Sequence, residues 1–139
     1  MRDQGNYDAA EPLYRRALTI CEKVLGAKHP VTLGSTQQLG VFLRGQEKYD
    51  EAELLLRGVI KKKEITSETD ETDLAGSLNA LGLLLAKTDR TDEAKTLYHR
   101  ALEIREIAFG FDHPQTVLIR ERLAEITNKQ DINKPSAEI

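Results

Sequence analysis

The sequence repeats itself with a period of 42 residues. Tyr7, Tyr49 and Thr91 occupy the same position in three successive periods, and an aspartate follows each of them. Other positions keep the register without a gap: Leu13, Leu55 and Leu97; Leu39, Leu81 and Leu123; and His29 and His113, two periods apart. A fixed period of this size is typical of repeat proteins, in which each unit packs mainly on its neighbours. The sequence therefore predicts a stack of repeats instead of a closed globule.

Each period contains two helical patterns. Apolar residues recur at helical spacing over residues 30–44 and again over residues 49–64. Gly40 and Gly82 fall where two helices have to approach closely. We therefore expect an all-α fold of antiparallel helix pairs, with about six helices. Pro12 lies inside the second-helix pattern, and we expect it to kink that helix without ending it.

Several residues mark the expected helix ends. Pro30 and Pro114 suit the first turn of a helix, where the backbone amide has no intrahelical partner. Gly26 and Gly110 follow apolar runs and indicate helix ends that need a left-handed residue. Thr91, followed by two acidic residues, is interpreted as a helix N-cap.

The small and large residues of these helix pairs resemble those of the tetratricopeptide repeat (TPR) family. The positions that carry the resemblance are Leu81, Gly82, Leu85, Ala94, Tyr98 and Ala101. The 42-residue period and the run from Leu25 to Pro30 are similar to the kinesin light chain subgroup. The resemblance implies an α-solenoid wound as a right-handed superhelix. It places complete repeats at 28–69 and 70–111, partial repeats at 1–27 and 112–127, and a C-terminal tail of low order at 128–139.

Composition and motifs remove several function classes. The net charge of −3 and the isolated basic run argue against a nucleic-acid partner. The sequence has no apolar run long enough to predict a membrane span, and the single cysteine favours a cytoplasmic location. No motif for a metal, a cofactor or catalysis occurs, so we expect a protein that is not an enzyme. We interpret Lys61 to Lys63 as a solvated helix end, with a phosphate-binding patch as the alternative.

In tetratricopeptide folds the first helix of each pair lines a concave groove that holds peptide segments. Carried over position by position, this implies the groove residues Gln37, Val41, Arg44, Asn79, Leu83, Lys87 and Glu121. The same transfer adds Gly34, Gly76, Ala86, Leu118 and Glu125 as less specific lining. Asn79 matches the asparagine that, in this subgroup, can hydrogen-bond a peptide backbone, and Gln37 is a longer substitute for it.

The leading hypothesis is a non-enzymatic scaffold that binds a peptide segment of a partner protein in this groove. The alternative is self-association into a homodimer through the first helix. Its residues Leu13, Tyr14 and Leu18 are apolar positions that would pack on a preceding helix. The same feature is expected of a fragment of a longer protein. A regulatory appendage of an enzyme is a third possibility.

Overall fold

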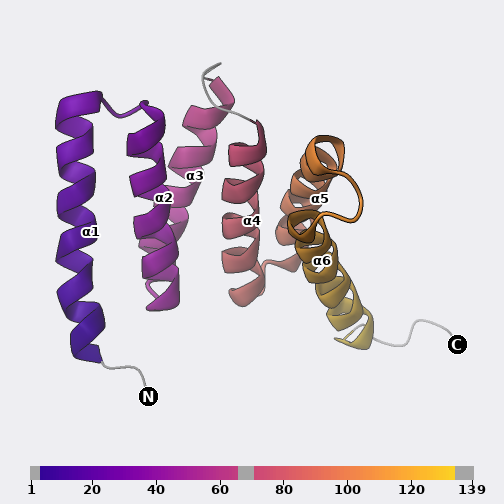
Figure 1. Cartoon of the computed structure of the whole chain (residues 1–139). Coiled ribbons are helices and arrows are strands. Elements are labelled where there is room, and N and C mark those ends of the chain that lie inside the picture. Colours follow the sequence, from indigo (N-terminus) through magenta and orange to yellow (C-terminus); the bar gives the residue numbers. More distant parts are fainter. Residues whose placement is uncertain (1–3, 66–70, 134–139) are drawn as a thin grey trace, which may run out of the picture.

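The computed structural model describes residues 4–65 and 71–133, and these form six α-helices with no strand among them (Figure 1). The helices are α1 (Gln4–Leu25), α2 (Pro30–Gly45), α3 (Tyr49–Ile65), α4 (Glu71–Lys87), α5 (Thr91–Phe109) and α6 (Pro114–Asn133). Each helix packs mainly on its neighbours in the chain, and α2 also touches α4. The helices therefore form an α-solenoid, as the period predicts.

The expected close approaches occur at two equivalent glycines. A Cβ placed on Gly82 of α4 would lie 2.8 Å from Cε1 of Tyr98 on α5. One repeat earlier, a Cβ on Gly40 of α2 would lie 3.0 Å from Leu56 Cδ2 on α3. Tyr98 and Leu56 are both fully buried, so each large side chain fills the space that its glycine leaves open.

The predicted helix ends are confirmed at both His-Pro pairs. The Nδ1 atoms of His29 and His113 accept hydrogen bonds of 3.1 Å from the amides of Val31 and Gln115. Each histidine thereby satisfies one of the free amides in the first turn of its helix. Before them, Gly26 has φ of 94° and Gly110 has φ of 95°, the left-handed region that these positions were expected to need.

Two boundary predictions are wrong. Thr91 is the first residue of α5 and the cap position is Arg90, whose side chain makes no capping bond. Helix α6 continues past the expected end at 127 to Asn133, because no proline or glycine interrupts that stretch. The rest of the expected tail, 134–139, lies outside the described residues.

We predicted that Pro12 would not end its helix, and α1 does continue on both sides of it. Helix α4 begins at Glu71, and residues 66–70 before it lie outside the described residues.

Ion pairs connect consecutive second helices on a surface that sequence reasoning did not anticipate. Glu53 of α3 accepts from Arg57 at 2.8 Å and from Arg90 at 2.7 Å, and Arg57 also reaches Glu93 of α5 at 2.7 Å. The equivalent residues one repeat earlier repeat the arrangement: Glu11, Arg15, Lys48 and Glu51. The hydrogen bond from Arg90 lowers the pKa of the Glu53 carboxyl below its usual value.

Candidate functional site: the face of α2, α4 and α6

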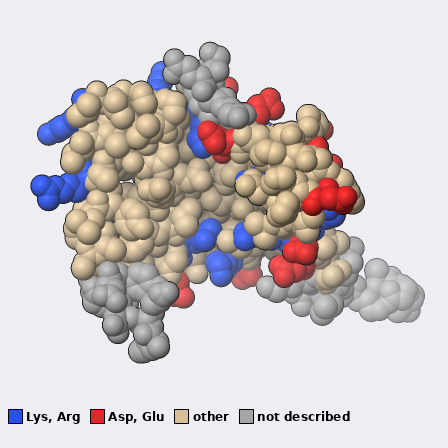
Figure 2. Space-filling model, in the orientation of Figure 1, with Lys and Arg blue, Asp and Glu red and all other residues tan. Residues whose placement is uncertain are grey.

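The first helices of the repeats, α2, α4 and α6, share one face of the solenoid, which Figure 2 views directly. Basic side chains gather near the middle of this face, and acidic ones gather on the side of α6 (Figure 2). Two cavities open along it. We call them the upper pocket, beside the N-terminal ends of these helices, and the lower pocket, near the C-terminal end of α4.

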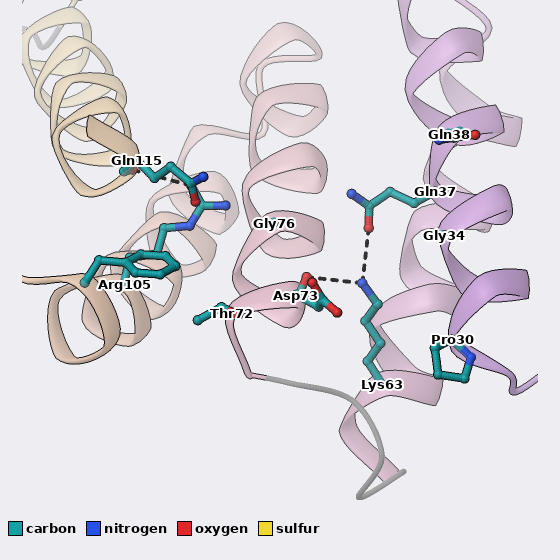
Figure 3. A pocket seen from close by; sticks show the side chains of 11 residues that line it. Pro30, Gly34, Gln37, Gln38, Lys63, Thr72, Asp73, Gly76, Arg105 and Gln115 are labelled. Carbon is teal, nitrogen blue, oxygen red and sulfur yellow. Dashed lines mark hydrogen bonds between the residues drawn. The ribbon is translucent and has the colours of Figure 1, made fainter. Parts of the chain in front are cut away.

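The upper pocket has a volume of about 480 Å³. Its lining residues are Pro30, Gly34, Gln37, Gln38, Lys63, Thr72, Asp73, Gly76, Arg105, Phe109 and Gln115 (Figure 3). The first turns of α2, α4 and α6 all contribute to this wall. These helix starts meet the last turns of α3 and α5 at the same wall, so the partial charges of helix ends oppose one another there, and the formal charges of the wall come from Lys63, Arg105 and Asp73.

Gln37 is held in place by two side chains of neighbouring helices. Its Oε1 accepts a hydrogen bond from the Ser77 hydroxyl and a longer one, of 3.4 Å, from Lys63 Nζ (Figure 3). Because the carbonyl end of the amide is engaged in this way, the Nε2 end faces Gly76, where an added Cβ would lie 4.0 Å from it. The amide therefore presents its donor to the pocket.

Lys63 enters the same wall from the end of α3. Its Nζ donates to the Ser77 hydroxyl at 2.9 Å and to the Asp73 carbonyl at 3.1 Å. None of the acceptors described for it is a carboxylate, and burial lowers the pKa of its ammonium group. The Asp73 side chain is exposed at the rim and acts on Lys63 only as a more distant charge.

Arg105 is the most deeply buried charge in this wall. Its side chain is only 8% exposed, and its Nε has no hydrogen-bond partner. Its Nη1 donates a long hydrogen bond of 3.4 Å to the Gln115 carbonyl. Its Nη2 would lie 3.6 Å from a Cβ placed on Gly76. Burial, and secondarily the neighbouring Arg122, lower the pKa of this guanidinium. Within the described residues, no carboxylate forms an ion pair with Arg105.

The lower pocket is smaller, with a volume of about 260 Å³. Leu83, Ala86, Lys87, Thr91, Tyr98, Arg122, Glu125 and Ile126 line it. Burial raises the pKa of the Tyr98 hydroxyl, and the nearby charge of Arg122 acts against this shift. Arg44 of α2 is half-buried; burial, and secondarily the charge of Arg122, lower the pKa of its guanidinium. The middle of the face is thus basic.

Of the seven groove residues taken from the sequence, three line the cavities: Gln37 the upper pocket, and Leu83 and Lys87 the lower one. Asn79 is one helical turn from the lining residues of both pockets, and its Oδ1 is buried without a hydrogen-bond partner. The other three residues differ in exposure: Arg44 is half-buried, Val41 packs partly against the core, and Glu121 is exposed.

Sequence reasoning missed Lys63 and Arg105. Lys63 was assigned to a solvated helix end, which describes the exposed Lys61 but is wrong for Lys63. The signal was present in the period, since Cys21, Lys63 and Arg105 are spaced by 42 residues. In each repeat this position near the end of the second helix packs against the start of the next first helix.

The residues proposed for self-association divide between two sides of α1. Leu13 is 65% exposed and shares a stripe at helical spacing with Ala17, Ile20 and Val24, all of them exposed. Tyr14 is partly buried, with its ring 4.8 Å from that of Phe42 on α2. Leu18, also partly buried, packs against the core. The exposed apolar stripe therefore includes only one of the three residues named from the sequence.

The described residues contain neither a membrane-spanning helix nor a cluster of metal ligands. None of the described helices has the length and apolar character required to cross a bilayer. Among the same residues, no group of three or more His, Cys, Asp or Glu side chains is placed to hold a metal ion.

Comparisons with known proteins agree with this architecture. Two tetratricopeptide repeat models match the sequence, one over residues 1–61 and the other over residues 74–115. No curated protein matches it.

Among solved structures, a kinesin light chain protein from Podosopora anserina with nearly identical TPR-like repeats aligns with a TM-score of 0.80 at 22% identity. BtubC (BKLC) from P. vanneervenii aligns with a TM-score of 0.63 at 17% identity. The alignments cover 91% and 97% of this chain, but only 60% and 62% of those structures. The chain therefore belongs to the tetratricopeptide repeat family, and its solenoid has the fold of kinesin light chain-like repeats.

Proposed function

We propose that this protein is a non-enzymatic scaffold that binds an extended segment of a partner protein along the face of α2, α4 and α6. The observation that carries the proposal is a continuous stripe on α4. Gly76 lines the upper pocket, Leu83 and Lys87 line the lower one, and Asn79 lies between them. From Gly76 to Lys87 the stripe rises by eleven residue steps, or roughly 16 Å of helix, which matches about five residues of extended peptide.

The chemistry of this stripe suits main-chain recognition combined with two side-chain subsites. The Asn79 amide can turn to give a donor and an acceptor to a peptide backbone. The lower pocket combines apolar walls from Leu83 and Ile126 with the charges of Lys87 and Glu125. Such a surface would hold a segment through its backbone and select it through two side chains.

A screen of random peptides, followed by calorimetric titration of the selected sequences, tests this function. The double variant Asn79→Ala with Leu83→Ala should weaken binding about tenfold or more. The control Glu103→Ala changes an exposed residue of α5 and should bind as the original protein does. Equal affinity of all three proteins, with helicity retained, would remove the groove as the binding surface.

A second function is favoured by the exposed stripe of α1. We infer that Leu13, Ala17, Ile20 and Val24 form a surface for self-association, since a contiguous apolar stripe of this kind marks an interface in soluble proteins. Sedimentation at rising concentration should show a dimer that Leu13→Glu with Ile20→Glu abolishes. A protein that stays monomeric throughout the range would exclude this function, and the groove would be unaffected.

A further inference from the structure

We propose that the upper pocket is a binding site for a phosphate monoester. If the phosphate belongs to a partner peptide, this site rests on the proposed groove function and adds a phosphorylated side chain to what the groove recognises. Lys63, Arg105 and Gln37 would bind the oxyanion. A phosphate-binding patch was the alternative interpretation of the basic run from Lys61 to Lys63. Of these three lysines, Lys63 lines the pocket.

The first argument is the cost of two cations in a wall without a paired carboxylate. Arg105 is more than nine-tenths buried, its Nε has no partner, and the bond from its Nη1 to the Gln115 carbonyl is long. Lys63 is half-buried among neutral acceptors. A buried charge without a counterion is unfavourable, so an anion entering the pocket would recover free energy that the empty site lacks.

The second argument is the convergence of donors from three helices. Arg105 Nη2 of α5 and Gln37 Nε2 of α2 lie within 3.6 and 4.0 Å of one point, the position of a Cβ on Gly76. Lys63 of α3 approaches from the side of Gln37 (Figure 3). Glycine at position 76 leaves this point open, so an oxygen atom placed there would face both donors.

The third argument is the kind of anion. A phosphate monoester has three terminal oxygens and a charge of roughly −1.5 to −2 at neutral pH. It can therefore accept from three directions and neutralise two cations, whereas a planar carboxylate has two oxygens and one charge. The pocket is lined by two cations, Lys63 and Arg105, and by the exposed Asp73. Three donors and this charge match a phosphate better than a carboxylate.

The phosphate could come from a phosphorylated side chain of the partner segment or from free phosphate. Calorimetric titration separates these sources with inorganic phosphate and with short alanine peptides that carry phosphoserine, serine or glutamate at the centre. We expect saturable binding of inorganic phosphate in about the millimolar range and tighter binding of the phosphoserine peptide. Equal affinity for phosphate and the phosphopeptide would assign the site to free phosphate and leave the peptide groove without this support.

Matched variants connect the binding to the pocket. Lys63→Gln and Gly76→Ala should each weaken phosphate binding about tenfold or more. Lys61→Gln removes the same charge from an exposed position of α3, and Gly58→Ala adds the same methyl group where nothing lies within 4 Å. Both controls should bind phosphate as the original protein does.

Gly76→Ala separates binding from folding. The new methyl group would be in ordinary van der Waals contact with its neighbours, and alanine favours the helix over glycine. This variant should therefore be as stable as the original or more so, and yet bind phosphate more weakly. Arg105→Gln is a further variant, but its buried position makes loss of folding an alternative cause of its effect.

Three results would overturn the proposal. They are no saturable binding of phosphate or the phosphoserine peptide, equal weakening by Lys61→Gln and Lys63→Gln, and equal affinity for the glutamate and phosphoserine peptides. Random peptides that bind the groove while phosphate does not would leave the scaffold function intact and remove only the phosphate site.

Discussion

Replacing Gly82 with alanine should destabilise the protein, although alanine is the better helix former. A Cβ at this position would lie 2.8 Å from Cε1, 3.0 Å from Cδ1 and 3.2 Å from Cζ of Tyr98. Atoms this close must separate, and the tyrosine ring cannot yield easily because it is rigid and only 1% exposed. The clash therefore has to move α4 and α5 apart.

The expected magnitude is the difference between two opposing terms. Overpacking of a closely filled core costs about 1–3 kcal/mol, and glycine to alanine in a helix interior returns about 1 kcal/mol. Since the shortest contact of a Cβ at Gly82 would be 2.8 Å, we expect a net loss of about 1–2 kcal/mol in the free energy of unfolding. A chain of this length should then melt roughly 3–8 °C lower.

Urea denaturation followed by circular dichroism measures this change, with Gly58→Ala as the matched control. Because nothing lies within 4 Å of a Cβ at Gly58, the control should gain up to about 1 kcal/mol. The two variants therefore carry the same substitution in helices and should shift stability in opposite directions. If both stabilise the protein, the contact between Gly82 and Tyr98 is not a packing constraint and the reasoning is refuted.

A double variant tests the same contact from the other side. The first complete repeat places Leu56 against Gly40, so Tyr98→Leu copies that pair in the second repeat. The leucine is smaller and more flexible, and the alanine at position 82 should be better tolerated beside it. We expect the combined loss to be smaller than the sum of the single losses by about 1 kcal/mol. Additive losses would mean that the two residues do not interact.

Three further predictions follow from the helix ends and the ion pairs. Glu53→Gln should lower the free energy of unfolding by about 0.5–1 kcal/mol at neutral pH. Because folding lowers the pKa of Glu53, the ionised carboxylate stabilises the folded protein only above that pKa. The difference in unfolding free energy between the variant and the original should therefore disappear in denaturation curves as the pH falls through and below 4.5. Gly110→Ala should cost about 1–2 kcal/mol in thermal unfolding, since its φ of 95° is strained for alanine although a Cβ there meets nothing. His113→Ala removes the bond to the Gln115 amide and a ring stacked 4.5 Å from Phe109, and should cost about 1 kcal/mol in the same assay.

The period and the local chemistry of single residues predicted most of the fold. Gly26 was recognised because glycine adopts a positive φ more easily than other residues, and Pro30 because a proline loses nothing in the first turn of a helix. Thr91 was misassigned because its side chain suits a cap, whereas the position of the turn depends on Asp89, whose positive φ the sequence does not reveal. Local preference therefore predicted the elements more reliably than their first residue.

The candidate site was less predictable because it depends on how neighbouring repeats stack. The lysine run at the end of α3 follows the rule that cations favour a helix C-terminus, and that rule treats the helix as isolated. In the solenoid the last turns of α3 meet the start of α4, so Lys63 faces Ser77 instead of water. A residue's neighbours in the next repeat, and not its own helix, decided its environment.

The position shared by Cys21, Lys63 and Arg105 shows what stacking does and does not require. Cys21 is half-buried and contacts Ser35, with 3.6 Å between Sγ and Oγ, so a small and weakly polar side chain is sufficient for two repeats to pack there. Arg105 occupies the same position with a nearly buried guanidinium whose Nε has no partner. Such a charge costs free energy that packing alone would not demand. The difference between the first and third of these positions is therefore better explained by what enters the pocket than by what holds the helices together.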